Sequence, residues 1–261
     1  MIITLTTDFG LADPFVGIMK GVILGIAPNV QLVDVTHEIP PYDILEAAFL
    51  VDSAYPYFPP GTIHVVVVDP GVGSVRRPMV AAANGHIFVA PDNGVLSNVL
   101  HAESRPAPAA YWVTNDRLFL DAVSQTFHGR DIFAPVAAHL ARGTPIESVG
   151  PRIVDFMRKA PSKPNVLDGK LIGQVLRIDK FGNIITNLRR QDLPAEFSIH
   201  VASLVITRLC SSFSEADPGE YFAIEGSTGY IELALNQGSA AAALKVRRGA
   251  EIEVETGLVN Q

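Results

Sequence analysis

Two hydrophobic periods alternate along the first part of the chain, one typical of strands and one typical of helices. Strands are predicted by β-branched runs at residues 2–6, 30–35 and 63–68. Helices are predicted by apolar residues at helical spacing within residues 14–26, 44–51 and 132–141. The third strand is apolar at almost every position, which is typical of a strand covered on both faces of a parallel or mixed sheet. The alternation predicts an α/β fold.

Turn and cap residues add local detail to this pattern. Asn84-Gly85 joins the runs at 79–83 and 86–90, and this dipeptide predicts a β-hairpin. Pro14 suits the first turn of the first helix, and Asp13 before it is expected to be the N-cap.

The pattern changes after residue 155. Prolines and basic residues interrupt any periodicity up to residue 170, so we interpret 156–170 as a linker between an α/β domain at 1–155 and a second domain at 171–261. In the second domain, β-branched runs separated by Gly and Asn predict a small all-β fold. Its strands are predicted at residues 171–178, 184–186, 198–206, 230–235 and 252–254. The alanine-rich run 239–243 is expected to serve packing.

Composition and charge exclude several classes of protein. The chain has 261 residues, of which 48% are hydrophobic and 18% charged, and its mean hydropathy is +0.26. Such a chain buries enough apolar surface to exclude intrinsic disorder, and it has no long uncharged stretch that predicts a membrane span. A net charge of −7 argues against nucleic-acid binding, and the single Cys210 excludes an intrachain disulfide. The N-terminus lacks the basic region of a signal peptide, so a cytoplasmic location is expected. The low charge content predicts a surface partly covered by another subunit.

A carboxylate, a glycine-rich loop and two guanidinium groups follow the most apolar strand. Asp69 opens the sequence Asp-Pro-Gly-Val-Gly-Ser-Val-Arg-Arg, which ends with Arg76 and Arg77. Ligands of α/β sheets bind beyond the carboxyl ends of strands, so these residues are candidates for chemistry. The alternative is a strand-terminating turn with surface arginines. The loop lacks the third glycine and the lysine of a phosphate-binding loop.

Two further polar clusters stand beside predicted elements. His128, in Phe-His-Gly-Arg-Asp, is a candidate general base or water-orienting group, because imidazole titrates near neutral pH; the alternative is a loop or capping histidine. Asp8, at the end of the first strand, is placed to accept hydrogen bonds from a ribose diol, or it is a turn aspartate.

The predicted β domain contributes a cluster of its own. Asp179 is a candidate to bind an ammonium group, Phe181 to stack on a ring, and Asn183 to bind a base edge. A β-hairpin with a glycine turn is the alternative. The remaining histidines show no metal-ligand spacing, and we expect no metal.

Taken together, these clusters resemble the SAM hydroxide adenosyltransferases, which are relatives of the fluorinating and chlorinating enzymes that act on S-adenosylmethionine (SAM). The resemblance covers essentially the whole chain. The matching motifs are Thr6-Thr7-Asp8-Phe9-Gly10, Asp34-Val35-Thr36-His37-Glu38-Ile39-Pro40, Asp69-Pro70-Gly71-Val72-Gly73, Ala90-Pro91-Asp92-Asn93-Gly94, Phe127-His128-Gly129-Arg130-Asp131, Phe181-Gly182-Asn183 and Gly226-Ser227-Thr228-Gly229-Tyr230.

The resemblance implies a reaction and a catalytic set. SAM and water give adenosine and L-methionine by attack at the ribose C5′, and no cofactor is needed because SAM is the substrate. The family activates water with an Asp, an Arg seven residues later and the His of Phe-His-Gly-Arg-Asp, which correspond to Asp69, Arg76 and His128. The choice of Arg76 over Arg77 rests on that spacing.

The resemblance also implies substrate contacts and an assembly. The implied binding residues are Asp8 at the ribose hydroxyls, Asp13 and Asp179 near the methionine portion, Ser227 at the methionine carboxylate, Asn183 at the adenine, Phe181 as a stacking or packing neighbour, and Gly129. The family joins an N-terminal α/β domain to a C-terminal β-barrel-like domain. It forms trimers whose active sites lie between the N-domain of one subunit and the C-domain of its neighbour, so a homotrimer is expected here.

Departures from the halogenases favour water over halide. Aromatic residues occupy the positions of Asp69 and His128 in the halogenases, and these enzymes carry an extra loop for which residues 90–112 are too short. Phe15 stands where the halogenases use a serine for the methionine carboxylate, and Tyr42 matches an aromatic position of their pocket. Two alternatives to SAM hydrolysis remain, namely halogenase-like adenosyl transfer and a non-catalytic module that binds adenosine or SAM.

Overall fold

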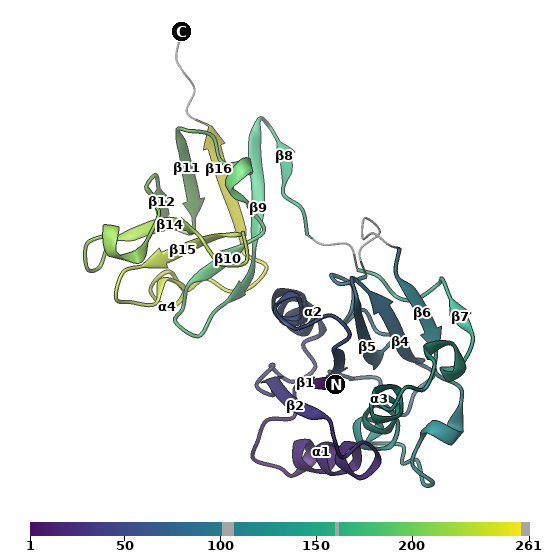
Figure 1. Cartoon of the computed structure of the whole chain (residues 1–261). Coiled ribbons are helices and arrows are strands. Elements are labelled where there is room, and N and C mark those ends of the chain that lie inside the picture. Colours follow the sequence, from purple (N-terminus) through teal and green to yellow (C-terminus); the bar gives the residue numbers. More distant parts are fainter. Residues whose placement is uncertain (101–106, 160–161, 257–261) are drawn as a thin grey trace. The chain divides into compact units, whose positions relative to one another are not determined.

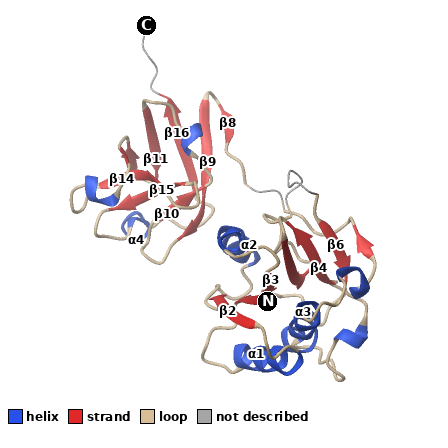
Figure 2. Cartoon of the chain, viewed as in Figure 1, coloured by secondary structure: helices blue, strands red, loops and turns tan. Residues whose placement is uncertain are grey.

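The computed structural model describes residues 1–100, 107–159 and 162–256, and the chain divides into two compact units, Met1–Pro161 and Ser162–Gln261 (Figure 1). The division falls inside the predicted linker 156–170. Residues 160 and 161 of that linker, and residues 257–261 of the predicted second domain, lie outside the described residues. The longer helices belong to the first unit, whereas strands dominate the second (Figure 2). The predicted α/β class is confirmed.

A seven-stranded mixed sheet forms the centre of the first unit. Its strand order is β2-β1-β3-β5-β4-β6-β7; the first four strands of this order are parallel neighbours, and the other three are added antiparallel. The strands are β1 (Ile2–Thr7), β2 (Gln31–Thr36), β3 (Ile63–Val67), β4 (Pro78–Ala83), β5 (His86–Pro91), β6 (Ala109–Trp112) and β7 (Arg152–Ile153). The parallel strands end at one edge of the sheet, where α/β folds bind ligands.

Three helices cover the two faces of this sheet: α1 (Phe15–Ile26), α2 (Ile44–Ala54) and α3 (Ala134–Ala141). α1 and α3 pack together on one face, and α2 covers the other (Figure 1). In β3, Val65 and Val67 belong to the core under α1 and α3, whereas Val66, and Val68 directly after the strand, belong to the core under α2. The prediction of a strand covered on both faces is therefore confirmed.

The local signals were right for the hairpin and wrong for the first helix cap. Asn84 and Gly85 both have positive φ, 52° and 80°, as a two-residue hairpin requires, and they connect β4 to β5. Pro14 itself occupies the N-cap position of α1, without a side-chain hydrogen bond. Asp13 is consequently one residue too far from the helix to cap it. A π-helical turn (Gly129–Phe133) precedes α3, so the helical segment begins earlier than the apolar spacing predicted.

The second unit is built on one nine-stranded sheet. The strand order is β12-β11-β16-β9-β10-β15-β14-β13, and β8 pairs with β9 outside this path. The strands are β8 (Asn165–Leu167), β9 (Lys170–Ile178), β10 (Ile184–Thr186), β11 (Phe197–Val201), β12 (Leu204–Ile206), β13 (Leu209–Cys210), β14 (Tyr221–Glu225), β15 (Ile231–Leu235) and β16 (Glu251–Thr256). The sheet curls around its core so that β12 also lies near β14.

Two details of the second unit depart from or add to the sequence pattern. The single strand predicted at 198–206 is wrong, because Ala202 adopts a φ of 51° and turns the chain between β11 and β12. The alanine-rich run forms the short helix α4 (Ala240–Leu244), and its buried Ala240 and Ala241 pack in the core. Among the described residues, no helix is both long enough and apolar enough to cross a membrane.

Candidate active site

A cavity of about 640 Å³ opens at the carboxyl ends of β1 and β3. Four of the predicted catalytic and binding residues line it, namely Asp8, Asp69, His128 and Gly129. The other lining residues are Phe9, Phe15, Pro41, Tyr42, Val67, Val72, Ser124, Thr126, Phe127 and Arg130. The loops that follow two parallel strands thus meet the segment before α3, at the edge where the fold predicts a ligand.

Arg76 joins Asp69 to His128. Its Nε lies 3.0 and 2.9 Å from the two carboxylate oxygens of Asp69, and its Nη2 also donates to Asp69 Oδ2. The same Nη2 lies 2.7 Å from Nδ1 of His128. The side chains of Arg76 and Asp69 are only 8% and 5% exposed, so the ion pair is shielded from water. The three residues implied to activate water therefore form one hydrogen-bonded network.

The guanidinium of Arg76 decides where His128 carries its proton. Arginine has only donors, so Nδ1 of His128 accepts and the proton of the neutral ring is on Nε2. Burial lowers the pKa of His128 below its ordinary value, and the positive charge of Arg76 lowers it further. Near neutral pH, the ring is uncharged and acts as a donor through Nε2.

Arg77 has different partners from Arg76. Its Nε and Nη2 lie 2.9 and 2.7 Å from Asp92 Oδ2, and its Nη1 lies 3.0 Å from Asp155 Oδ1. Asp92 also accepts a hydrogen bond of 2.7 Å from the backbone N–H of Met157. Arg77 thus connects β4 to the chain beyond β7, and this supports the spacing that selected Arg76 for the site.

Two close contacts hold the loops of the site in place. Gly73 has a φ of 74°, and a Cβ at this position would lie 2.4 Å from the carbonyl oxygen of Gln125, so glycine is required where the two loops touch. Asp131 is fully buried, and its Oδ2 accepts hydrogen bonds of 2.8 and 2.7 Å from the N–H and hydroxyl of Ser124. These contacts set the position of Asp69 and Arg76 relative to His128.

Asp8 is far in sequence from Asp69, Arg76 and His128, but it lines the same cavity as Asp69 and His128. Its Oδ2 accepts a hydrogen bond of 2.9 Å from the backbone N–H of Tyr42, which leaves carboxylate lone pairs for a ligand. Tyr42 has a φ of 68°, which is strained for a tyrosine, and its side chain is 71% exposed. The structure therefore brings both Asp8 and Tyr42 to the cavity.

Three phenyl rings form an apolar part of the cavity lining. Phe9, Phe15 and Phe127 contact one another edge to face, with ring centroids 5.2–5.8 Å apart. A Cβ on Gly129 would lie 3.1 Å from Phe127 and 3.4 Å from Phe9, so the glycine lets the rings approach the backbone. Neither Phe9 nor Phe127 was assigned a role from the sequence, although both stand inside the motifs that carry Asp8 and His128.

Other predicted site residues do not line this cavity. Asp13 is exposed on the turn before α1, and Asp179, Phe181, Asn183 and Ser227 belong to the second unit. Ser124 and Thr126 line the cavity without any signal in the sequence that could have identified them.

The Asp179 cluster forms a tight turn between β9 and β10. Oδ1 of Asp179 accepts hydrogen bonds from the backbone N–H groups of Phe181 and Asn183, at 2.9 and 2.8 Å, and Oδ2 accepts from the Asn183 amide at 2.9 Å. Phe181 is 75% exposed. The hairpin-turn alternative is therefore present in the structure, and the ligand roles of these residues stay predictions.

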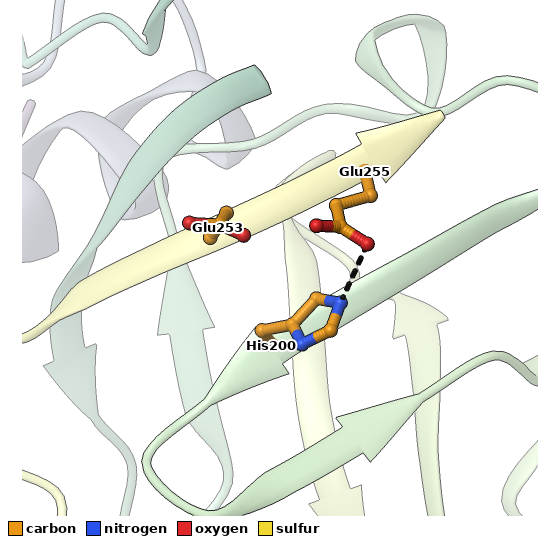
Figure 3. A group of neighbouring side chains, drawn as sticks. All are labelled: His200, Glu253 and Glu255. Carbon is orange, nitrogen blue, oxygen red and sulfur yellow. Dashed lines mark ion pairs between the residues drawn. The ribbon is translucent and has the colours of Figure 1, made fainter. Parts of the chain in front are cut away.

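One group of side chains in the described part of the chain has the composition of a metal site. His200, Glu253 and Glu255 lie close together on β11 and β16 (Figure 3), and Nε2 of His200 is 3.3 Å from Glu255 Oε2. Nζ of Lys170 forms ion pairs with both glutamates, at 2.7 Å in the case of Glu255. Because the ammonium group of Lys170 already pairs with both carboxylates, we interpret the group as a surface ion-pair network.

Comparisons with known proteins agree with the motifs. Residues 3–150 match the SAM hydroxide adenosyltransferase N-terminal domain, and residues 173–253 match the C-terminal domain. A protein from Salinispora tropica named (R)-S-adenosyl-L-methionine hydrolase is 39% identical, with 98% of each chain covered. A fluorinase from Nocardia brasiliensis is 30% identical, with 98% of this chain and 97% of that protein covered. The crystal structure of an uncharacterized conserved protein from Thermotoga maritima superimposes with a TM-score of 0.89 at 38% identity, with 98% of this chain and 100% of that chain covered. The chain therefore belongs to the SAM hydroxide adenosyltransferase family.

Proposed function

We propose that this protein hydrolyses SAM to adenosine and L-methionine by attack of water on the ribose C5′. The observation that carries the proposal is the buried network of Asp69, Arg76 and His128 beside a cavity large enough for a nucleoside. The names of the hydrolase relatives support the substrate and the reaction.

The leaving group needs no help from an acid. As the C5′–O bond forms, the C5′–S bond breaks, and the sulfonium sulfur takes the bonding electrons and leaves as a neutral thioether. The difficulty lies in the nucleophile, because neutral water attacks slowly and must be held in line with the breaking bond. The site therefore has to orient one water and accommodate the proton that it loses.

The observed hydrogen bonds divide this task among the three residues. His128 is a donor and not a base, because Arg76 occupies Nδ1 and the ring proton is on Nε2. Asp69 remains as the acceptor for a proton of the water, and this proton passes on to solvent. The buried charge of Arg76 attracts the growing negative charge on the water oxygen more strongly than an exposed charge would.

Labelled water tests both the reaction and the bond that breaks. The purified protein is incubated with SAM in oxygen-18 water, and the products are examined by mass spectrometry. Adenosine and methionine should appear in equal amounts, with the label in the 5′-hydroxyl of adenosine. Absence of adenosine at high enzyme concentration contradicts the proposal, and formation of 5′-halo-adenosine in the presence of chloride or fluoride would identify a halogenase.

Two carboxylates that follow neighbouring parallel strands, Asp69 after β3 and Asp92 after β5, provide a matched pair of variants. Asp69→Asn removes the charge that pairs with Arg76, and turnover is expected to fall by about 100-fold or more. Asp92→Asn removes the corresponding partner of Arg77 outside the cavity, and turnover per folded molecule should be preserved. Tight binding of SAM without turnover by the unmodified protein would instead identify a binding module.

We also propose that the protein acts as a homotrimer, in which residues of the second unit of a neighbouring copy complete the substrate site. The support is the exposure of large apolar residues near the cavity, since Leu11 and Tyr42 are 68% and 71% exposed and Val75 is fully exposed. Light scattering should report three chains per particle. A stable monomer that turns over SAM contradicts this proposal.

A further inference from the structure

The motif that follows β2 takes no part in the water-activating network, yet it places a buried histidine beside the loop of Asp8. His37 is only 4% exposed, and its backbone carbonyl accepts a hydrogen bond of 2.8 Å from the N–H of Gly10. This contact joins the chain after β2 to the chain after β1. Asp8 lies between that contact and the end of β1, so the surroundings of His37 decide where Asp8 is held.

The imidazole of His37 is the central link of a polar chain through the first unit. Its Nδ1 lies 2.8 Å from the hydroxyl of Thr7, and its Nε2 lies 3.1 Å from Asp34 Oδ1. The other oxygen of Asp34 accepts a hydrogen bond of 2.6 Å from Nζ of Lys20 on α1. Burial by itself raises the pKa of Asp34, but the interactions with Lys20 and His37 outweigh this effect and hold the pKa below its ordinary value.

The donors and acceptors from Asp34 through His37 and Thr7 to Phe9 can be assigned in one consistent order. The charged Asp34 favours the ring proton of His37 on Nε2, so Nδ1 is left to accept from the Thr7 hydroxyl. The oxygen of that hydroxyl then accepts the backbone N–H of Phe9, at 3.2 Å. Both ends of the peptide segment around Asp8 are therefore fixed by His37, through Thr7 on one side and through Gly10 on the other.

We propose that His37 is a positioning residue that holds Asp8 in the orientation needed to bind the ribose hydroxyls of the substrate. The inference rests on the proposed function, because it takes Asp8 as the ribose-binding carboxylate. His37 does not line the cavity, so its effect is transmitted through Thr7 and the backbone of residues 8–10. Loss of the imidazole should weaken the binding of ligands that carry ribose hydroxyls and leave the contacts to other parts of the ligand unaffected.

A pair of nucleosides separates this role from a general contribution to folding. Dissociation constants of adenosine and of 2′,3′-dideoxyadenosine are measured by calorimetry with the full chain and with His37→Ala. Hydrogen bonds to a carboxylate should make the wild-type protein bind adenosine about tenfold more tightly than the dideoxy compound. In His37→Ala this ratio should approach one through weaker adenosine binding, while the dideoxy compound binds as before. In turnover assays, KM for SAM should rise more than kcat changes.

Three further variants keep the test decisive. His37→Asn retains an amide near the Nδ1 position and should restore part of the ratio, and Thr7→Val breaks the same chain with an isosteric side chain if the alanine variant does not fold. Thr36→Val is the matched control, because it removes the hydroxyl at the end of β2, which accepts a hydrogen bond from the N–H of Glu38 and is not part of the chain from Asp34 to Phe9. A wild-type ratio in His37→Ala or Thr7→Val overturns the role of His37. Equal binding of the two nucleosides by the wild-type protein overturns the role of Asp8, and the inference with it.

Discussion

Acidification should destabilise the first unit through His64, a buried histidine that forms no ion pair with a carboxylate among the described residues. His64 on β3 is 3% exposed and stacks on Phe88, with ring centroids 5.0 Å apart. Its Nδ1 lies 2.8 Å from the Thr4 hydroxyl, and its Nε2 lies 3.2 Å from Nδ1 of His86. Burial and, to a lesser extent, the neighbouring His86 together lower the pKa of His64 from 6.5 to about 4.

The sign and size of the effect follow from this shift. The unfolded chain takes up a proton at His64 below pH 6.5, whereas the folded chain stays neutral there until about pH 4. Stability is therefore complete above the ordinary pKa and decreases as the pH falls through this window. With 1.36 kcal/mol per pKa unit, His64 alone should remove roughly 2 kcal/mol between about pH 7.5 and about pH 5, and roughly 3 kcal/mol below pH 4.

Urea unfolding followed by tryptophan fluorescence measures the stability of the first unit, Met1–Pro161. The chain has a single tryptophan, Trp112 on β6, so its signal reports the unit that contains His64. In His64→Asn, the amide can still bond the Thr4 hydroxyl, but the side chain at position 64 no longer titrates. The decrease in unfolding free energy between about pH 7.5 and about pH 5 should therefore be smaller by roughly 2 kcal/mol. His86, whose pKa is also lowered by burial, accounts for part of the decrease that remains.

Tyr55→Phe is the matched control, because it removes a hydroxyl of the same cluster without removing an imidazole. Its stability curve should lie below that of the wild type by a similar amount at every pH between these limits. If the wild-type and His64→Asn curves decline in parallel, the reasoning from burial to pKa is refuted.

Three further predictions concern the site. Arg76→Lys should lower kcat by about 100-fold because lysine cannot bind Asp69 and His128 together, whereas Arg77→Lys should cost about 1–3 kcal/mol of unfolding free energy and leave kcat unchanged; steady-state kinetics and urea unfolding distinguish them, and equal kcat losses would contradict the assignment. A pH profile of kcat/KM should stay flat down to the ordinary histidine pKa of 6.5 and decline only below it, because the lowered pKa keeps His128 neutral; a decline that begins above 6.5 would disagree. Gly73→Ala should cost about 1–3 kcal/mol and also reduce kcat, because the loop has to move away from the Gln125 carbonyl; unchanged kcat in the folded variant would show that this contact does not position the site.

Periodicity was sufficient to predict the elements whose hydrophobic pattern agrees with their burial. β3 and the hairpin of β4 and β5 lie where the sequence placed them, because their residues meet the core on known faces and their turn is encoded by Asn84-Gly85. The strands β6, β7, β8, β13 and β14 were missed, and β8 lies within the stretch predicted as a linker. The two-residue β13 is too short to show a period, whereas the Tyr, Phe and Ile of β14 (Tyr221–Glu225) are compatible with a strand. The break between β11 and β12 was missed because an alanine such as Ala202 rarely adopts a positive φ and therefore does not predict a turn.

The site was predictable as a set of residues but not as a geometry. Asp69, Arg76 and His128 were connected by resemblance, and their hydrogen bonds become visible only when the loops after β3 and before α3 are brought together. The difference between Arg76 and Arg77 could be stated from spacing, while its physical cause is the separate carboxylate of Asp92. The role of His37 was not predictable from its own motif, because its partner Thr7 comes from another strand, although Asp34 lies only three residues away.

The antiparallel direction of β4, which lies beside the four parallel strands, determines where the residues of the site stand in the sequence. Because β4 runs antiparallel to β5, the residues just before it return to the edge where β3 ends. The acid and its cationic partner are thus seven positions apart on one connection, and closing so short a loop costs little entropy, whereas His128 arrives from 52 positions beyond Arg76. Both members of the Asp69–Arg76 ion pair therefore lie on the connection between β3 and β4. Exchange of this one connection would replace both charges at once, while every strand keeps its register.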